Sequence, residues 1–392
     1  MTEVLFITHK YPPMIGGMEK QSYHLIKGMS RHYKTHVIAY QKKGNKLLWF
    51  IRLQSKIKAT LQENPNIKLI HLNDGLMGVA CLWLQNYTNI PVVVTYHGLD
   101  ITFPHSFFQN KLIPKLTNYS GAICVSESTR NLCIKRGFNE KLTFTVRNGI
   151  DNQLANIQPN ENIKERLQHL YKVDVSNKRI IVSTGRPVKR KGFSWFLKNV
   201  MPLLDKNIIF LMIGPLNNKP ALFERIVERL PKTASHTIQL MLGFATDTKE
   251  LIKLVAEQES VYHLGKVSDE DLFQVLLLAD LFVMPNIKVE GDTEGFGLVA
   301  LEASIRGAYV VASGIEGIKD AVIDGKNGCL LPSENAQAWA DKIHKLLSDE
   351  DKLKILSLQG KEYTEKQYSW DIMADGYKYV FDKLTSTKQI KE

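Results

Sequence analysis

A cluster of positive charge in the second half of the sequence has the chemistry to bind a diphosphate. Arg186, Lys189, Arg190 and Lys191 place four cations within six residues, directly after the β-branched run of residues 179–184. Guanidinium and ammonium groups held between a strand and a helix form charge-assisted hydrogen bonds with phosphate oxygens. A solvated basic turn is the alternative. The position at the end of a strand favours the phosphate interpretation.

Two carboxylates follow further along the chain, at Glu294 and Glu302, with Gly295 and Gly297 between them. On one helix they would be roughly 12 Å apart along the axis and about 80° apart around it. That separation is close to the reach from a hexose, across a diphosphate, to a ribose. A glycine-flanked helix start between them would offer amides and the positive dipole end to phosphates. We therefore predict that one carboxylate binds sugar hydroxyls and the other binds ribose hydroxyls.

Two loops in the first half carry the next candidates. Residues 11–19 hold two prolines and two glycines, Gly16 and Gly17, before a helical pattern, and backbone without side chains lets a phosphate or sugar approach closely. His97 follows the buried run of residues 91–96 and could bind a substrate hydroxyl or transfer a proton. An ordinary turn and a satisfied core histidine are the alternatives.

Three other patterns receive structural interpretations. Residues 295–300 match GxGxxA, but they lie late in the chain and far from their strand, which argues against a dinucleotide site. Residues 269–271 match the DxD pattern of manganese sites, yet they follow a serine and open an apolar run, as a capped helix start does. Residues 47–60 could form a membrane-surface helix, although a helix packed on its own sheet is the commoner explanation.

The elements that must position these residues alternate between short β-branched runs and longer amphipathic stretches. This rhythm is typical of α/β proteins with doubly wound parallel sheets. It stops at a polar stretch, residues 148–162, and then restarts, so two tandem Rossmann-like domains are expected: residues 1–150 and 151–392, with the tail 370–392 able to pack on either. Ligands bind beyond the carboxyl ends of such strands, so a cleft between the domains is predicted. The expected strands are residues 4–8, 35–39, 68–72, 91–96, 121–125, 142–146, 179–184, 207–213, 260–263, 280–284 and 308–312.

Composition limits the protein class. The chain has 392 residues, 44% hydrophobic and 23% charged, which excludes disorder, collagen and coiled coils. Four cysteines without a CxxC pair, no signal-peptide pattern and no apolar run of spanning length predict a cytoplasmic protein. Of the net charge of +11, all lies in residues 1–151, with 19 Lys and Arg against 8 Asp and Glu. A basic first half suggests an anionic partner, either a membrane surface or nucleic acid, with ordinary solubility charge as the alternative.

Together these motifs resemble the family-four retaining glycosyltransferases of the GT-B fold. The resemblance rests on residues 11–19, on His97 and Gly98, on residues 148–151, on Arg186 with Lys191, and on the E-x7-E spacing of Glu294 and Glu302. Each motif alone is weak, but their order and spacing cover nearly the whole chain. The insert at residues 290–292 is longer than in many members and resembles a subgroup that includes mannosyltransferases.

The resemblance implies a role for each site residue. Arg186 and Lys191 would hold the diphosphate in place of a divalent metal, Glu302 the ribose and Glu294 a hexose hydroxyl. His97 would contact the reacting sugar. The other donor-binding residues would be Gly16 and Gly17 for the phosphate, Lys266 and Val267 for the base, and the amides of Phe296, Gly297 and Leu298 for the phosphates.

The expected function is therefore metal-independent transfer of a hexose from a UDP- or GDP-linked sugar to a saccharide or lipid-linked acceptor, in cell-envelope polysaccharide or glycolipid synthesis. No cofactor is expected, and the basic first domain would meet an anionic membrane from the cytoplasmic side. A sugar-nucleotide epimerase or sugar phosphorylase is the same-fold alternative. A nucleic-acid-binding protein is the alternative from another class, but no recognised binding module supports it.

Overall fold

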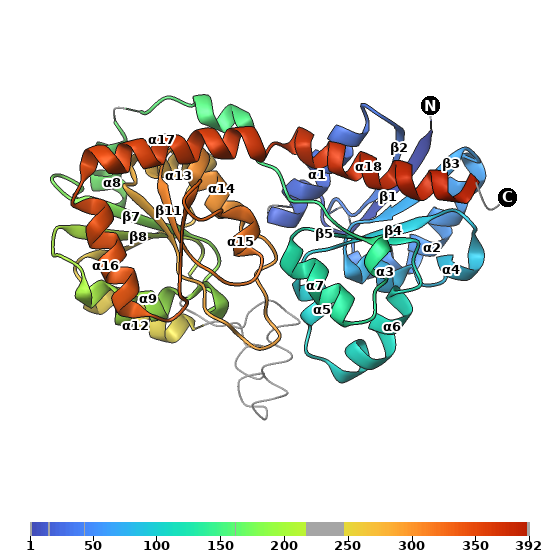
Figure 1. Ribbon diagram of the computed structural model, residues 1–392, viewed down its shortest axis with the longest axis horizontal. Helices are drawn as coiled ribbons and strands as arrows, with labels where there is room; N and C mark the ends of the chain where they lie inside the picture. Colours follow the sequence, from blue (N-terminus) through green and yellow to red (C-terminus); the bar gives the residue numbers. More distant parts are fainter. Residues whose placement is uncertain (1, 15, 43, 161, 217–246, 390–392) are drawn as a thin grey trace. The chain divides into compact units, whose positions relative to one another are not determined.

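The computed structural model describes residues 2–14, 16–42, 44–160, 162–216 and 247–389 (Figure 1). The chain divides into two compact units, Met1–Ile150 with Tyr368–Glu392, and Asp151–Gln367. Each unit is built around one six-stranded parallel sheet with helices on both faces. The predicted fold of two Rossmann-like α/β domains is confirmed.

The first sheet has the strand order β2-β1-β3-β4-β5-β6, so the direction of winding changes between β1 and β3. Strands β1, β4 and β5 are buried along their whole length because helices cover both faces, as parallel sheets require, whereas the edge strand β2 is partly exposed. The strands are β1 (Glu3–Thr8), β2 (Lys34–Ala39), β3 (Ile67–Leu72), β4 (Val92–Tyr96), β5 (Gly121–Cys124) and β6 (Thr143–Thr145).

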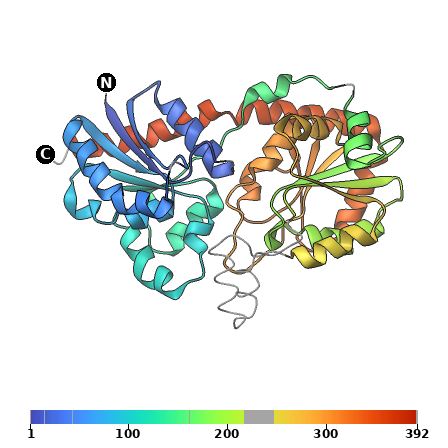
Figure 2. The ribbon, with the colours of Figure 1, turned by 180° about the vertical axis from the view of Figure 1, so that it is seen from behind.

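Two apolar layers hold the helices of the first unit against this sheet. One face packs on α2, α3, α6 and α7, and the other on α1 and α18. The α18 helix crosses in front of the first sheet in Figure 1 and behind it in Figure 2. The helices are α1 (Gly17–Met29), α2 (Lys46–Glu63), α3 (Gly75–Ala80), α4 (Leu84–Tyr87), α5 (Leu99–Thr102), η1 (Phe108–Leu112), α6 (Ile113–Leu116), α7 (Glu127–Lys135), η2 (Glu140–Leu142) and α18 (Trp370–Gln389).

The C-terminal segment returns to the first unit at Gly149. The Ile150 N–H donates to the Tyr368 carbonyl at 3.0 Å. A Cβ at Gly149 would lie 2.5 Å from Ser369 backbone atoms, so only glycine allows the two segments to pass this closely. Beyond this crossing, α18 inserts Tyr377 and Phe381 into the core on the α1 face.

The second sheet has the order β12-β11-β10-β7-β8-β9, with its change of winding between β7 and β10. Its strands are β7 (Arg179–Thr184), β8 (Ile208–Ile213), β9 (Val261–Gly265), β10 (Leu281–Met284), β11 (Tyr309–Ser313) and β12 (Gly328–Leu331). The sequence analysis did not predict β12. Its four residues, Gly-Cys-Leu-Leu, lack the β-branched side chains that mark the other strands.

Helices again form two layers around this sheet. One face packs on α8, α13 and α14, and the other on α9, α12 and α16, while α17 packs on α14. The helices are η3 (Asn152–Asn156), α8 (Ile163–Tyr171), η4 (Lys189–Lys191), α9 (Phe193–Asn199), η5 (Met201–Leu203), α12 (Thr248–Glu257), α13 (Asp269–Leu278), α14 (Leu298–Ile305), α15 (Ile318–Ala321), α16 (Ala336–Leu347) and α17 (Glu350–Gln367).

Candidate functional site

Two of the predicted cations, Arg190 and Lys191, meet the predicted carboxylate Glu294 where the second sheet changes winding. The cations follow β7 in the turn η4, and the carboxylate lies in the loop after β10. The two loops approach each other at Gly192, whose φ is +67°. A Cβ at this position would lie 1.9 Å from the Pro285 carbonyl oxygen, so glycine allows this close approach. Open parallel sheets bind their ligands at this kind of position.

Lys191 and Glu294 form a buried ion pair at this edge. Lys191 Nζ lies 2.7 Å from Glu294 Oε2, and their side chains are only 11% and 12% exposed. Asn286 Nδ2 donates a 3.2 Å hydrogen bond to the same carboxylate oxygen. The pair therefore places one cation and one hydrogen-bond acceptor together at the ligand-binding edge of the sheet.

Arg190 is a second buried cation of this site; the sequence analysis counted it among four cations for a diphosphate but gave it no role of its own. Arg190 Nη1 donates to both carboxylate oxygens of Asp292, at 3.0 and 3.1 Å, and its Nε lies 3.4 Å from Glu294 Oε2. Asp292 is itself 4% exposed and follows the turn at Gly291. The acidic insert thus supplies a carboxylate that holds Arg190 against Glu294.

The charges of this cluster set the protonation of its carboxyls. Burial alone would raise the pKa of Glu294, but the charges of Lys191 and Arg190 outweigh burial and lower that pKa to about 2. For Lys191, burial lowers the pKa and the charge of Glu294 only partly offsets it. Burial raises the pKa of Glu316 to about 7, although its Oε2 accepts a 2.7 Å hydrogen bond from the Glu294 N–H. Glu294 is therefore ionised at neutral pH, whereas Glu316 titrates there.

Glu316 gives a testable dependence of stability on pH. The pKa of Glu316 is about 7 in the folded protein and 4.5 ordinarily. Between these pH values the folded protein therefore keeps a proton on Glu316 that the unfolded chain releases. The resulting stabilisation is complete below pH 4.5 and is lost as the pH rises through about 7. We expect the melting temperature of Glu316→Gln, compared with that of the wild type at the same pH, to be higher at about pH 8 than at about pH 5. Thermal melts at both pH values check this; a constant difference between the two proteins would contradict it.

The expected helical spacing of Glu294 and Glu302 is wrong. Glu294 precedes α14, which starts at Leu298 because Gly297 adopts a φ of +100° and ends the loop. Glu302 does lie in α14, and it is buried. The two carboxylates therefore belong to a loop and a helix, and the distance calculated for a single helix does not apply. Phe296 and Gly297 directly precede the helix, which is the position assumed when their backbone amides were predicted to bind phosphates.

The other predicted donor residues of the second unit occupy neighbouring strand ends. Arg186 follows β7 and is exposed, and its charge contributes to the lowered pKa of Lys191, after burial and Arg190. Lys266 and Val267 follow β9, where Lys266 is exposed and Val267 half-buried. The adjacent Gly265 carbonyl accepts the Gly214 N–H of the β8 loop at 2.9 Å. All these residues lie at the carboxyl edge of the sheet.

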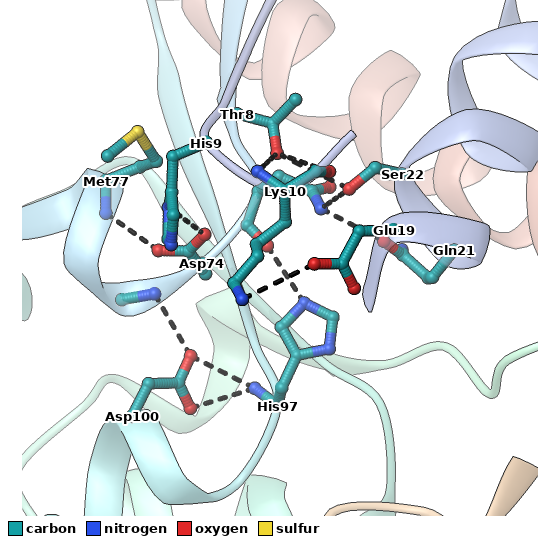
Figure 3. A network of polar contacts seen from close by, with 12 residues as sticks. Thr8, His9, Lys10, Glu19, Gln21, Ser22, Asp74, Met77, His97 and Asp100 are labelled. Atoms are coloured by element: carbon teal, nitrogen blue, oxygen red, sulfur yellow. Dashed lines mark hydrogen bonds and ion pairs between the residues drawn. The ribbon is translucent and has the colours of Figure 1, made fainter. Parts of the chain in front are cut away.

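In the first unit, His97 follows β4 and is fixed at two points (Figure 3). The backbone N–H of His97 donates to both carboxylate oxygens of Asp100, at 2.9 and 3.1 Å. Nε2 of its ring lies 2.9 Å from the Asn73 carbonyl oxygen. Because a carbonyl only accepts hydrogen bonds, Nε2 carries a proton and Nδ1 of the neutral ring is an acceptor. The imidazole can therefore accept a hydrogen bond from a hydroxyl.

The glycine loop of the first unit has a carboxylate beside it. A Cβ at Gly16 would lie 2.3 Å from Glu19 Oε2, so Glu19 fills the space next to this glycine. Lys10 Nζ lies 3.4 Å from Glu19 Oε1, and Gly17 begins α1. A phosphate approaching Gly16 would thus meet a carboxylate that Lys10 partly neutralises.

Two of the three patterns given structural interpretations, residues 269–271 and 47–60, lie in helices that pack on their own unit. Ser268 caps α13 by accepting the Asp271 N–H at 3.0 Å, and Asp271 pairs with Arg166 at 2.8 Å. Residues 269–271 are therefore a helix start. The α2 helix buries Trp49 and two further apolar side chains in the core of the first unit, as a Rossmann helix does.

Solved structures share this two-unit architecture. The Anabaena protein HepE, in a crystal structure in complex with UDP and glucose, superposes with a TM-score of 0.71 at 18% identity, covering 98% of this chain and 100% of that one. Two six-stranded parallel-sheet units of this kind are the GT-B fold.

Sequence comparison identifies the family. Residues 15–154 match the family described as Glycosyltransferase Family 4, and residues 171–363 match Glycosyl transferases group 1. An uncharacterized glycosyltransferase of Methanocaldococcus jannaschii is 24% identical over 96% of this chain and 97% of its own length. The capsular polysaccharide biosynthesis glycosyltransferase CapM of Staphylococcus aureus is 25% identical over 81% of this chain and 76% of its own. The chain belongs to the family-four glycosyltransferases.

Proposed function

We propose that this glycosyltransferase moves a hexose from a UDP- or GDP-linked sugar to a hydroxyl of a saccharide or lipid-linked acceptor, in the synthesis of a cell-envelope polysaccharide or glycolipid. The observation that carries the donor proposal is the buried Lys191–Glu294 pair where the second sheet changes winding. The capsular-polysaccharide relative supports the acceptor class, and the UDP and glucose bound to the Anabaena protein support the donor class.

In this proposal the second unit holds the donor. Arg186 and Lys191 bind the diphosphate, Glu294 binds a hexose hydroxyl and Glu302 the ribose. The start of α14 adds backbone donors and the positive end of a helix dipole. The remaining contacts are the amides of Phe296, Gly297 and Leu298 to the phosphates, and Lys266 and Val267 to the base.

The proposed chemistry is a same-face displacement that retains the anomeric configuration. The bond between the anomeric carbon and the diphosphate breaks while the acceptor oxygen attacks from the same side. The departing phosphate oxygen then takes the acceptor's proton. Lys191, which Glu294 holds in place, and Arg186 stabilise the developing negative charge, which is the role that a divalent metal has in other transferases. The first unit supplies Gly16 and Gly17 for the donor phosphate and His97 for the reacting sugar.

A thermal-shift panel in excess EDTA tests this proposal. UDP, GDP, UDP-glucose and GDP-mannose are compared, because a ligand that binds only the folded protein raises its melting temperature. We expect one nucleotide and its sugar conjugate to stabilise the protein without metal, and nucleotide release to follow when the sugar conjugate and a saccharide acceptor are supplied together. Stabilisation only in the presence of manganese would contradict the metal-independent site.

The first unit has features of a surface for anionic lipid, and we include membrane contact in the proposed function. Between Glu19 and Glu63 the sequence contains ten Lys and Arg and no Asp or Glu. The outer face of α2 exposes three apolar side chains, Leu47 at 68%, Leu48 at 48% and Ile51 at 66%. Cations beside exposed apolar groups on one helix suit the interface of an anionic bilayer. Among the described residues, no helix is long and apolar enough to cross a bilayer.

Vesicle flotation measures this contact. We expect the protein to float with anionic but not with neutral vesicles, to be released by moderate salt, and to lose most binding when Leu47, Leu48 and Ile51 are changed to Ser. The control is Ile355→Ser with Leu358→Ser, which removes two side chains of α17 that are each 58% exposed. Equal loss in both variants, or no flotation at low salt, would contradict the surface.

A further inference from the structure

A second imidazole of the first unit lies where its sheet changes winding. His9 follows β1 and Asp74 follows β3, the two strands between which the winding reverses. His9 Nδ1 lies 3.0 Å from Asp74 Oδ2, and the side chains are 6% and 2% exposed. This is the position at which an open parallel sheet binds its ligand, so the pair occupies the equivalent of the Lys191–Glu294 position in the second sheet.

Asp74 fixes the imidazole of His9 in one orientation. Its Oδ1 accepts the Met77 N–H at 2.9 Å, which leaves Oδ2 for Nδ1 of His9. Burial would raise the pKa of Asp74, but its contact with His9 outweighs burial and lowers that pKa. With Nδ1 protonated toward an ionised carboxylate, Nε2 of the neutral ring is a hydrogen-bond acceptor. Within the described part of the chain, no hydrogen bond reaches this Nε2, and the 3.0 Å contact of Nδ1 with Asp74 is an ion-pair contact and not an aligned hydrogen bond.

The surroundings of His9 suit a polyhydroxyl ligand. Figure 3 shows His9, Lys10, Glu19 and His97 around the same part of the first unit. The Lys10–Glu19 pair, at 3.4 Å, adds one ammonium donor and one carboxylate acceptor with no net charge. Sugar hydroxyls both donate and accept hydrogen bonds, so the His9 imidazole, the Lys10 ammonium and the Glu19 carboxylate can each bind one.

We propose that His9 binds a hydroxyl of the acceptor sugar through Nε2, and that Asp74 is the positioning residue that holds its ring. This inference rests on the proposed function and narrows the acceptor group to a carbohydrate hydroxyl. His9 takes no proton in the reaction; the proton of the attacking hydroxyl still leaves on the departing diphosphate. Asn73 and Asp74 are consecutive, and they orient His97 and His9 respectively, so one short loop positions both imidazoles.

Two substitutions at His9 separate the two ring nitrogens. In His9→Asn, the amide nitrogen takes the place of Nδ1 and keeps the contact with Asp74, while the Nε2 acceptor is lost. In His9→Gln, the amide can replace Nε2 but no longer contacts Asp74. The matched control is His36→Asn, because His36 also pairs with a carboxylate, Glu3 at 2.7 Å, at the opposite end of β1.

The assay follows UDP or GDP release from UDP-glucose or GDP-mannose, with the methyl glycosides of glucose, galactose, mannose and N-acetylglucosamine as acceptors. We expect His9→Asn to raise the acceptor KM about tenfold and to leave the donor KM and melting temperature near the wild-type values. His9→Gln should lie between, and His36→Asn should match the wild type.

An unchanged acceptor KM in His9→Asn would overturn the assignment of His9. A wild-type protein that binds donor but transfers to none of the glycosides would overturn the carbohydrate acceptor. Failure of the wild type to bind either donor would instead refute the proposed function, so the two failures are distinguishable.

Discussion

Lys191→Met should reduce the rate of sugar transfer about 100- to 1,000-fold, which is the usual cost of removing one fixed donor from a developing negative charge. The Lys191 ammonium is buried 2.7 Å from Glu294. Lys191 also directly precedes Gly192, where the β7 and β10 loops approach each other. Its position is therefore fixed before the donor binds. Steady-state rates at saturating UDP-glucose or GDP-mannose provide the measurement.

The same substitution should also lower the free energy of unfolding, by about 2–3 kcal/mol, because it leaves the Glu294 carboxylate buried with one partner fewer. Adding Glu294→Gln to Lys191→Met removes the unpaired charge. We expect the double variant to recover most of the stability and none of the activity. Lys189→Met, which removes an exposed cation two residues away, is the control and should change neither quantity. Recovery of activity in the double variant would show that Lys191 acts only through Glu294.

Arg190→Met should have the largest effect on stability. Its side chain is 16% exposed and contacts Asp292 and Glu294, so its loss takes a cation from two buried carboxylates. Removing one partner of a buried ion pair costs about 3–5 kcal/mol of unfolding free energy. Urea denaturation of the variant beside Lys189→Met measures this cost.

The pattern of rescue identifies the cause. Asp292→Asn combined with Arg190→Met should restore part of the lost free energy, because one unpaired carboxylate is neutralised. If the single variant is as stable as Lys189→Met, then Arg190 does not organise the cluster, and the buried contacts with Asp292 and Glu294 carry little energy.

The fold could be predicted from the sequence because buried parallel strands consist of apolar, β-branched runs. Residues 179–184 were predicted with their observed bounds, and the other expected strands agree to within one or two residues. The missing strand, β12, is short and carries Gly328 and Leu330 where the others carry Val or Ile. Its place in the sheet comes from its pairing with β11, which a local pattern does not show.

The site was predicted at the level of loops and not of contacts. Arg190 and Lys191 look alike in a run of cations, and only the turn at η4 determines which of them faces Asp292. Glu316 lies 22 residues after Glu294 and enters the site through the loop that follows β11, which no local signal indicates. The helix expected to carry both Glu294 and Glu302 fails because Gly297 has a positive φ.

The pair His9 and Asp74 shows the same limit in the first unit. Both residues directly follow or nearly follow strands that were predicted, but the strand order was not known, so β1 and β3 could not be recognised as neighbours. The strand order therefore brings loop residues that are far apart in the sequence together in one site.

Titration calorimetry of UDP and GDP in EDTA tests the central claim most directly. The account predicts that one of the two binds the wild type without metal and that Lys191→Met weakens this binding at least about tenfold, whereas Lys189→Met does not. Binding that is equal in both variants and the wild type, or that appears only after manganese is added, would contradict a diphosphate site at Lys191.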